Sequence, residues 1–151
     1  MKKYFILVFA GFLSLFVTAQ AQNDELAIKS LIDKAYVEAI HNNGDLEEAR
    51  KGFHPGFDLL IIKNNMLEKL PIYNWIQSAA ERRVKNPESL QNAPTTLCKY
   101  LNFDIVGDAA IVKLELWRNN EKIFTDWLSL YQFEDGWKIV GKIYYRHPAV
   151  K

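Results

Sequence analysis

One acidic side chain stands in a strand-like segment where apolar side chains are expected. In "FTDWLSL", residues 124–130, Asp126 shares its alternation set with Phe124, Leu128 and Leu130. A carboxylate that faced the core in its ionised form without a partner would be strongly destabilising, so Asp126 must be paired, bind a ligand or be protonated. We favour an inward Asp126, because the opposite set is amphipathic, as an outer sheet face would be; it contains Thr125, Trp127, Ser129 and Tyr131.

The turn before this segment leaves an alternative open. A two-residue turn at Asn119-Asn120 would place Asp126 beside Lys113 on the outer face of the sheet. A one-residue bulge in either strand would reverse that orientation.

Lys142 is the candidate partner of Asp126. If residues 134–136 form a three-residue loop, Lys142 and Tyr144 fall on the same face as Asp126. If only the last two of these residues form the turn, Tyr145 faces Asp126 and Lys142 is a solvated surface lysine. Gly136 suits both loops, so both interpretations stay open.

The histidines offer one further candidate. His54 ends a predicted helix, where its imidazole could reach a cavity mouth and carry a proton; alternatively, His-Pro-Gly is a turn whose histidine caps a backbone carbonyl. We expect His41 to be exposed at a helix end and His147 to lie near the chain terminus. No histidine has a metal-ligand spacing to another histidine or to a carboxylate, so we expect no metal and no cofactor.

The first residues have the pattern of a secretory signal peptide. Lys2 and Lys3 precede an apolar run over residues 4–17, and Ala-Gln-Ala at residues 19–21 is a typical cleavage pattern. The run is shorter than the about 20 apolar residues that a membrane-spanning helix needs. We expect cleavage after Ala21, export to the periplasm or the medium, and a single domain over residues 22–151 with no membrane span.

The composition argues against several classes of partner. Loss of Lys2 and Lys3 would change the formal net charge from +1 to about −1, so there is no basic field for nucleic acid and no polybasic membrane anchor. Cys98 is the only cysteine, which excludes an internal disulfide. We interpret Cys98 as a small buried apolar residue rather than a catalytic thiol.

Helical periodicity dominates the first half of the chain. A long amphipathic helix is predicted from Asp24, as its cap, to Asn43-Gly44. A short second helix begins at Asp45, with Glu48 at the capping-box position, and ends at Phe53. The apolar stripe of the long helix consists of Ile28, Leu31, Ile32, Ala35, Tyr36, Ala39 and Ile40.

A turn at residues 54–56 and a hairpin of strands 57–63 and 66–69 should follow. The third predicted helix begins at Pro71, carries Trp75 on its inner stripe and ends at Asn86-Pro87, before a polar loop to Pro94.

Strand periodicity dominates the second half. Four long strands are predicted over residues 97–106, 109–118, 122–133 and 137–146, joined by hairpin turns. Leu101, Phe103 and Ile105 should form the core side of the first strand. Helices followed by an antiparallel meander indicate an α+β fold. Such a meander is strongly curved, so three helices packed in the curve would make a cone with a pocket at its wide end.

The chain resembles the nuclear transport factor 2-like (SnoaL-like) superfamily and, within it, the putative lumazine-binding family. The resemblance is carried by "AYVEAIHNNGDLEEARKGFHP" (35–55), "GDAA" (107–110), "FTDWLSL" (124–130) and "GWKIVGKIY" (136–144), and it covers essentially all of residues 22–151. It implies a cone-shaped fold, a cavity between sheet and helices, and a homodimer through the outer sheet face, where Trp117 and Trp127 would lie. It does not select an activity, because members include isomerases, dehydratases, cyclases and binding or assembly domains.

Tyr36 lies in a stretch, "AYVEAIHNNGD", that resembles ketosteroid isomerases, whose helical tyrosine donates to an oxyanion. Such enzymes need two further acids in the cavity. This chain departs from the pattern, because its first strand has only Asp58 at its start and Ser129 stands nearest the second position. We therefore interpret Tyr36 as a core aromatic residue whose hydroxyl reaches the cavity.

The sequence thus predicts an exported protein that binds a small, partly apolar molecule. The alternatives are a lyase or isomerase with Asp126 or His54 as general base, and a dimeric assembly module with a filled cone. The predicted ligand-binding residues are Tyr36, His54, Phe57, Trp75, Asp126, Lys142 and Tyr144.

Overall fold

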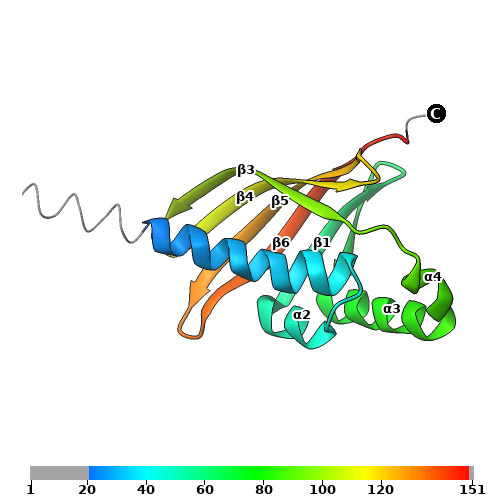
Figure 1. Ribbon diagram of the computed structural model, residues 1–151. Helices are drawn as coiled ribbons and strands as arrows, with labels where there is room; N and C mark the ends of the chain where they lie inside the picture. The colour runs from blue at the N-terminus through cyan, green and yellow to red at the C-terminus, as the bar shows by residue number, and fades with distance from the viewer. Residues whose placement is uncertain (1–20, 150–151) are drawn as a thin grey trace, which may run out of the picture.

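The computed structural model describes residues 21–149 and packs their helices against one curved, six-stranded sheet (Figure 1). The predicted signal peptide therefore lies outside the described residues, except for Ala21. Residues 21–32 are α-helical and continue directly into a π-helix, η1 (Asp33–His41). The later elements are α2 (Leu46–Gly52), β1 (Phe53–Lys63), β2 (Met66–Pro71), α3 (Ile72–Lys85), α4 (Pro87–Gln91), β3 (Leu97–Val106), β4 (Ala109–Arg118), β5 (Glu121–Phe133) and β6 (Gly136–Arg146).

The sheet has the strand order β2-β1-β6-β5-β4-β3. Strands β3 to β6 form the predicted antiparallel meander, and β1 joins its β6 edge in parallel. In Figure 1 the first helix crosses the sheet on the side where α2 and α3 also lie. The architecture is thus the predicted α+β cone.

Each antiparallel pairing within the meander contains one bulged residue. Leu101 is unpaired between β3 and β4, Ile123 between β4 and β5, and Val140 between β5 and β6. Bulges bend a strand and increase its twist, which curves the sheet around the helices. The bulge also corrects one prediction: Leu101 is 42% exposed, whereas Phe103 and Ile105 pack against the core as expected.

The two Asn-Asn turns are confirmed. Asn64 and Asn65 have φ angles of 51° and 61°, and Asn119 and Asn120 have 51° and 62°. Two successive positive φ angles are those of the type I′ turn, whose twist matches that of the flanking strands. These turns therefore close the β1–β2 and β4–β5 hairpins.

The first helix differs from its prediction at the N-terminal end. It is already helical at residue 21, so Asp24 lies inside the helix rather than at its cap. Its other end is as predicted: Asn43 has a φ of 60°, and the Gly44 amide donates to Glu38 O at 2.8 Å. A Cβ at Gly44 would lie only 3.0 Å from that oxygen, which favours glycine there.

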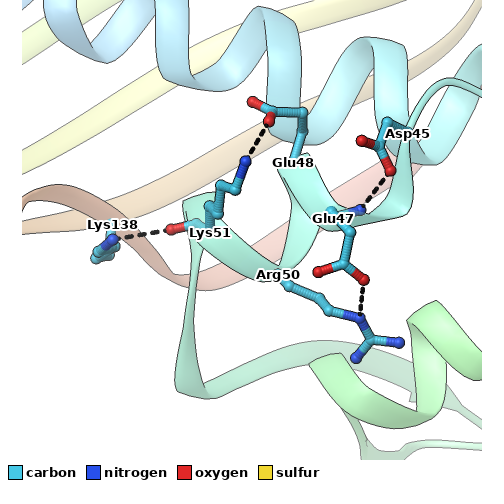
Figure 2. Close-up of polar contacts among 6 residues, drawn as sticks. All are labelled: Asp45, Glu47, Glu48, Arg50, Lys51 and Lys138. Carbon is cyan, nitrogen blue, oxygen red and sulfur yellow. Dashed lines mark hydrogen bonds and ion pairs between the residues drawn. The ribbon is translucent and has the colours of Figure 1, made fainter.

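Helix α2 is fixed at both ends (Figure 2). The Asp45 side chain accepts from the Glu47 amide at 2.9 Å, as an N-cap does. Glu48 does not complete a capping box; its carboxylate accepts from Lys51 Nζ at 2.9 Å. Lys138 Nζ on β6 donates to Lys51 O at 2.9 Å, which holds the end of α2 against the sheet.

Two segments that were predicted to be a turn and a loop form regular secondary structure instead. Residues 54–56 belong to β1, and the pairing of β1 with β6 is irregular between Phe53 and Asp58. The expected loop before Pro94 contains the short helix α4. Both predictions were wrong because Pro and Gly mark a break in regular pairing, and a break can be a bulge or a new helix start as well as a turn.

Candidate functional site

Three polar side chains meet in the interior between η1 and the sheet. Tyr36, Asp126 and Lys142 are 0%, 0% and 5% exposed. The Tyr36 hydroxyl donates to Asp126 Oδ2 at 2.5 Å and accepts from Lys142 Nζ. Lys142 Nζ also lies 3.1 Å from Asp126 Oδ1. These two atoms form an ion pair without hydrogen-bond geometry, so the ammonium charge stabilises an oxygen that accepts no hydrogen bond. We call these three residues the buried triad.

Two bulges place the triad. The bulge at Ile123 sets Asp126 opposite Leu114 instead of Lys113, and so turns its carboxylate inward. The bulge at Val140 sets Lys142 opposite Leu128, on the same face. The inward Asp126 and its pairing with Lys142 are thus confirmed, although by a bulge after a two-residue turn at residues 134–135 rather than by a three-residue loop.

Aromatic rings surround the Lys142 ammonium. Its nitrogen lies 4.6 Å from the ring centroid of Tyr36, 5.2 Å from that of Tyr144, 5.6 Å from that of Trp75 and 5.8 Å from that of Phe124. These distances are typical of cation–π contacts. The rings therefore form an aromatic cage whose cation is a side chain of the protein itself.

Burial and pairing act on the protonation of the triad. Burial lowers the pKa of Lys142, and Asp126 opposes that shift. Burial and the Asp126 carboxylate raise the pKa of Tyr36 well above its usual range. Tyr36 therefore keeps its proton and acts as a hydrogen-bond donor towards Asp126.

His41 corrects a prediction. It is not exposed: its imidazole packs edge-on against Tyr36 at 4.7 Å between ring centroids and lies 6.3 Å from Phe124. In an α-helix the side chains of residues 36 and 41 would point roughly 140° apart. The wider turn of η1, bonded from residue i to i+5, brings His41 back over Tyr36.

The His41 ring is electrostatically unusual. Its Nε2 atom is buried and has no hydrogen-bond partner among the described residues. Burial, followed by the positive charges of Lys142, Arg118 and Arg82, lowers the pKa of His41 to about 3. The imidazole is therefore neutral at physiological pH.

Of the other predicted site residues, some lie beside the triad and one does not. Trp75 and Phe57 stack at 6.1 Å, and Trp75 lies over Lys142, so both belong to the aromatic wall of the triad. His54 does not: it stacks on Phe133 at 4.8 Å, and its Nδ1 accepts from the Gly56 amide. Phe124 and His41 belong to the site but were not predicted; no 3.6-residue period would have found His41.

Residues that were considered for other chemistry lie elsewhere. Asp58 pairs with Lys69 at 3.1 Å, and Ser129 lies opposite Gly141 on the face away from Asp126. His147 lies near the chain terminus, as expected, with its Nε2 2.9 Å from Thr125 Oγ1. Burial raises the pKa of the Cys98 thiol to about 12, which makes it a poor nucleophile.

Two kinds of feature are absent from the described residues. Residues 21–149 contain no cluster of three or more His, Cys, Asp or Glu side chains suited to a metal ion. Within the same range no helix has the length and apolar character to cross a membrane.

Comparison with known proteins identifies the fold. The family model described as "Putative lumazine-binding" matches residues 23–145. No curated protein sequence matches the chain. A nuclear transport factor 2-like protein of unknown function from Shewanella baltica has a TM-score of 0.64 at 24% identity, over 84% of this chain and 96% of its own. One from Silicibacter pomeroyi has a TM-score of 0.66 at 15% identity, over 84% and 98%.

A third such protein, from Methylobacillus flagellatus, has a TM-score of 0.61 at 23% identity, over 83% of this chain and 94% of its own. At these identities the likeness concerns the fold alone. It confirms the nuclear transport factor 2-like cone that the sequence resembled.

Replacing one member of the triad should be far more harmful than replacing all three. Lys142→Met leaves a buried carboxylate without its counter-charge, and we expect a loss of about 3–5 kcal/mol in the free energy of unfolding. The triple change Tyr36→Phe/Asp126→Leu/Lys142→Met removes every polar group of the triad, so its free energy of unfolding should return to within about 2 kcal/mol of the wild type. Urea unfolding followed by circular dichroism measures both. Equal losses in the single and triple variants would contradict the ion pair.

His41 should contribute to acid sensitivity. Its pKa falls from 6.5 in the unfolded chain to about 3 in the fold, so its stabilising contribution is present above pH 6.5 and is lost as the pH falls towards 3. At about 1.4 kcal/mol per pH unit over the roughly two units below pH 6.5, His41→Phe should lose about 2–3 kcal/mol less than the wild type between pH 7 and pH 4.5. Parallel urea titrations with identical pH slopes would show that His41 is not buried in its neutral form.

Proposed function

Because the chain belongs to the putative lumazine-binding family of nuclear transport factor 2-like proteins, we propose that it is an exported protein that binds a small, partly apolar molecule inside the cone. The observation that supports this proposal most strongly is the buried triad of Tyr36, Asp126 and Lys142. The family description does not by itself transfer a pterin ligand to this chain.

The triad is difficult to explain as a stabilising device. An ion pair that is removed from water is often no more stabilising than apolar side chains of the same volume, because desolvation offsets the attraction. Here Asp126 lies opposite Leu114, and Lys142 lies opposite Leu128, so both charged residues occupy positions among the apolar side chains of the core. Retaining charge there is understandable if the polar groups orient a ligand.

The site is closed in this structure, and its aromatic side is its least buried part. Asp126 has no exposed surface, whereas Trp75, Phe124 and Tyr144 keep part of their rings exposed. Rotation of Phe124 and Tyr144 away from Lys142 would admit a flat molecule above the ammonium. Lys142 would then give the ligand a charge-assisted hydrogen bond, and the displaced rings would supply apolar contact.

Catalysis has less support than binding. Both oxygens of Asp126 are engaged, Oδ2 by the Tyr36 hydroxyl and Oδ1 by Lys142, so neither is free to take a proton from a substrate. His54, the other candidate base, stacks on Phe133 and makes no recorded contact with the triad. No observation therefore favours the lyase or isomerase alternative.

We also propose that the protein is a homodimer through the outer face of the sheet. Ile111, Tyr131, Ile143 and Tyr145 are 44%, 48%, 52% and 54% exposed. The register places Ile143 opposite Trp127, so that these apolar side chains continue one another across β4, β5 and β6. An apolar face of this kind is typical of a subunit interface.

The binding proposal predicts a retained ligand. Native mass spectrometry of protein purified from its own host should show an added small-molecule mass on the wild type, and a mature chain that begins at Gln22. The triple apolar variant, which should fold, should lack the added mass. A ligand retained equally by the triple variant would remove the triad from the site. Absence of any added mass or ligand-dependent shift, even with concentrated host extract, would favour the filled-cone assembly module.

The dimer proposal predicts that a charge on the outer face separates the subunits. Ile143→Glu should sediment as a monomer at concentrations where the wild type is a dimer, because the interface would have to bury an unpaired carboxylate. Leu26→Glu, at a residue 60% exposed on the first helix, is the matched control and should remain dimeric. A monomeric wild type in analytical ultracentrifugation would refute the interface.

A further inference from the structure

Positive charges without acidic partners gather around one end of the cone. Arg118 ends β4, Arg146 ends β6, and Arg82 lies in the last part of α3. The ion pairs recorded for residues 21–149 include none of these three arginines. In a chain with a formal net charge of only +1, this local excess of cations is a distinct feature.

Neutral contacts hold two of these arginines next to the site. Arg118 donates to Thr96 Oγ1 at 2.7 and 3.2 Å, and the Thr96 backbone bonds the side chain of Asn42, the residue after His41. The Arg146 guanidinium lies 5.5 Å from the centre of the Phe124 ring. The Phe124 ring centroid lies 6.3 Å from that of His41, so Arg146 borders the aromatic ring next to His41, and Arg118 is linked through Thr96 to the residue after His41.

His41 supplies the complementary polar atom. Its Nε2 is buried without a hydrogen-bond partner, although an unsatisfied buried polar group costs about 1–3 kcal/mol. Two other buried atoms lack hydrogen bonds among the described residues, but each has compensation: Asp126 Oδ1 has the ion pair with Lys142, and the Arg83 guanidinium donates through its other nitrogens to Ala39 O and Gly44 O. Among the described residues, His41 Nε2 is the one buried atom of the three with neither an ion pair nor a bonded neighbouring group to compensate it.

The charge of the aromatic cage limits what can bind. Four aromatic rings around a cation would suit an ammonium ligand. Here the cage is already filled by a cation, the Lys142 ammonium, which leaves no free aromatic face for a cationic ligand. The charges that act on His41 are likewise those of cations, Lys142, Arg118 and Arg82. An anion is therefore the complementary group.

We propose that the ligand is a small organic acid with a flat apolar body, whose carboxylate accepts a hydrogen bond from His41 Nε2 and is held by Arg118 and Arg146. In this arrangement the body of the acid lies against Phe124 and Tyr144, above Lys142. His41 is the specificity-determining residue, since a neutral imidazole can donate to a carboxylate without an opposing charge of its own. This inference deepens the proposed function and rests on it.

The experiment compares two probes that share one ring system, one anionic and one neutral. Isothermal titration calorimetry with 2-naphthoate and with 2-naphthamide should show that the acid binds the wild type at least about tenfold more tightly, a difference of about 1.4 kcal/mol. Raising the salt concentration should weaken binding of the acid more than binding of the amide. His41→Phe and Arg146→Gln should each remove most of the preference for the acid.

The controls keep this inference separate from the function. Arg50→Gln, on α2, removes a guanidinium that already pairs with Glu47, and should leave the preference unchanged. If His41→Phe does not fold, Arg146→Gln and Arg118→Gln still test the claim. Equal affinity for acid and amide, or no binding of either probe, would overturn the organic-acid inference. The retained mass in the native spectrum would still test the proposed function independently.

Discussion

The burial of one ammonium group determines how the sheet and the first helix must meet. Lys142 is 5% exposed, and an isolated charge at that depth would be strongly destabilising. Its two polar partners come from other elements, Asp126 from β5 and Tyr36 from η1. Because each distance in the triad depends on both the helix and the sheet, the ion pair couples the curvature of the sheet to the position of the helix.

Three irregular features of the backbone serve this arrangement. The bulges at Ile123 and Val140 turn Asp126 and Lys142 to the same inner face, and the π-helical turn places His41 over Tyr36. A regular sheet and a regular α-helix would separate these side chains. Bulges and π-helical turns are frequent at functional sites, where they redirect a few side chains without changing the fold. Their coincidence around one group of residues supports a site there.

The same features explain what the sequence could and could not predict. Alternation of apolar residues and the Asn-Asn turns identified the strands, because each is a local signal. The inward orientation of Asp126 rested on its apolar neighbours and was correct, but the pairing with Lys142 depended on a bulge that no local signal marks. His41 was misplaced because a 3.6-residue period was assumed for a segment that is wider. His54 was included because the second helix was expected to end there beside a cavity mouth, whereas the residue lies in the extended strand β1.

The self-occupied cage has a consequence for how a ligand could be selected. A preformed empty cavity would be filled by water or by any apolar molecule of suitable size, whereas here the space above Lys142 is covered by the protein's own rings. A ligand must offer more than those rings do, and an apolar body alone only replaces one aromatic contact by another. The gain in binding free energy has to come from a polar interaction that is absent in the closed state. His41 Nε2 and the arginines without ion pairs are the groups that could form it. The triad would then orient the ligand, and the partly exposed aromatic rings that cover it would control how the ligand enters.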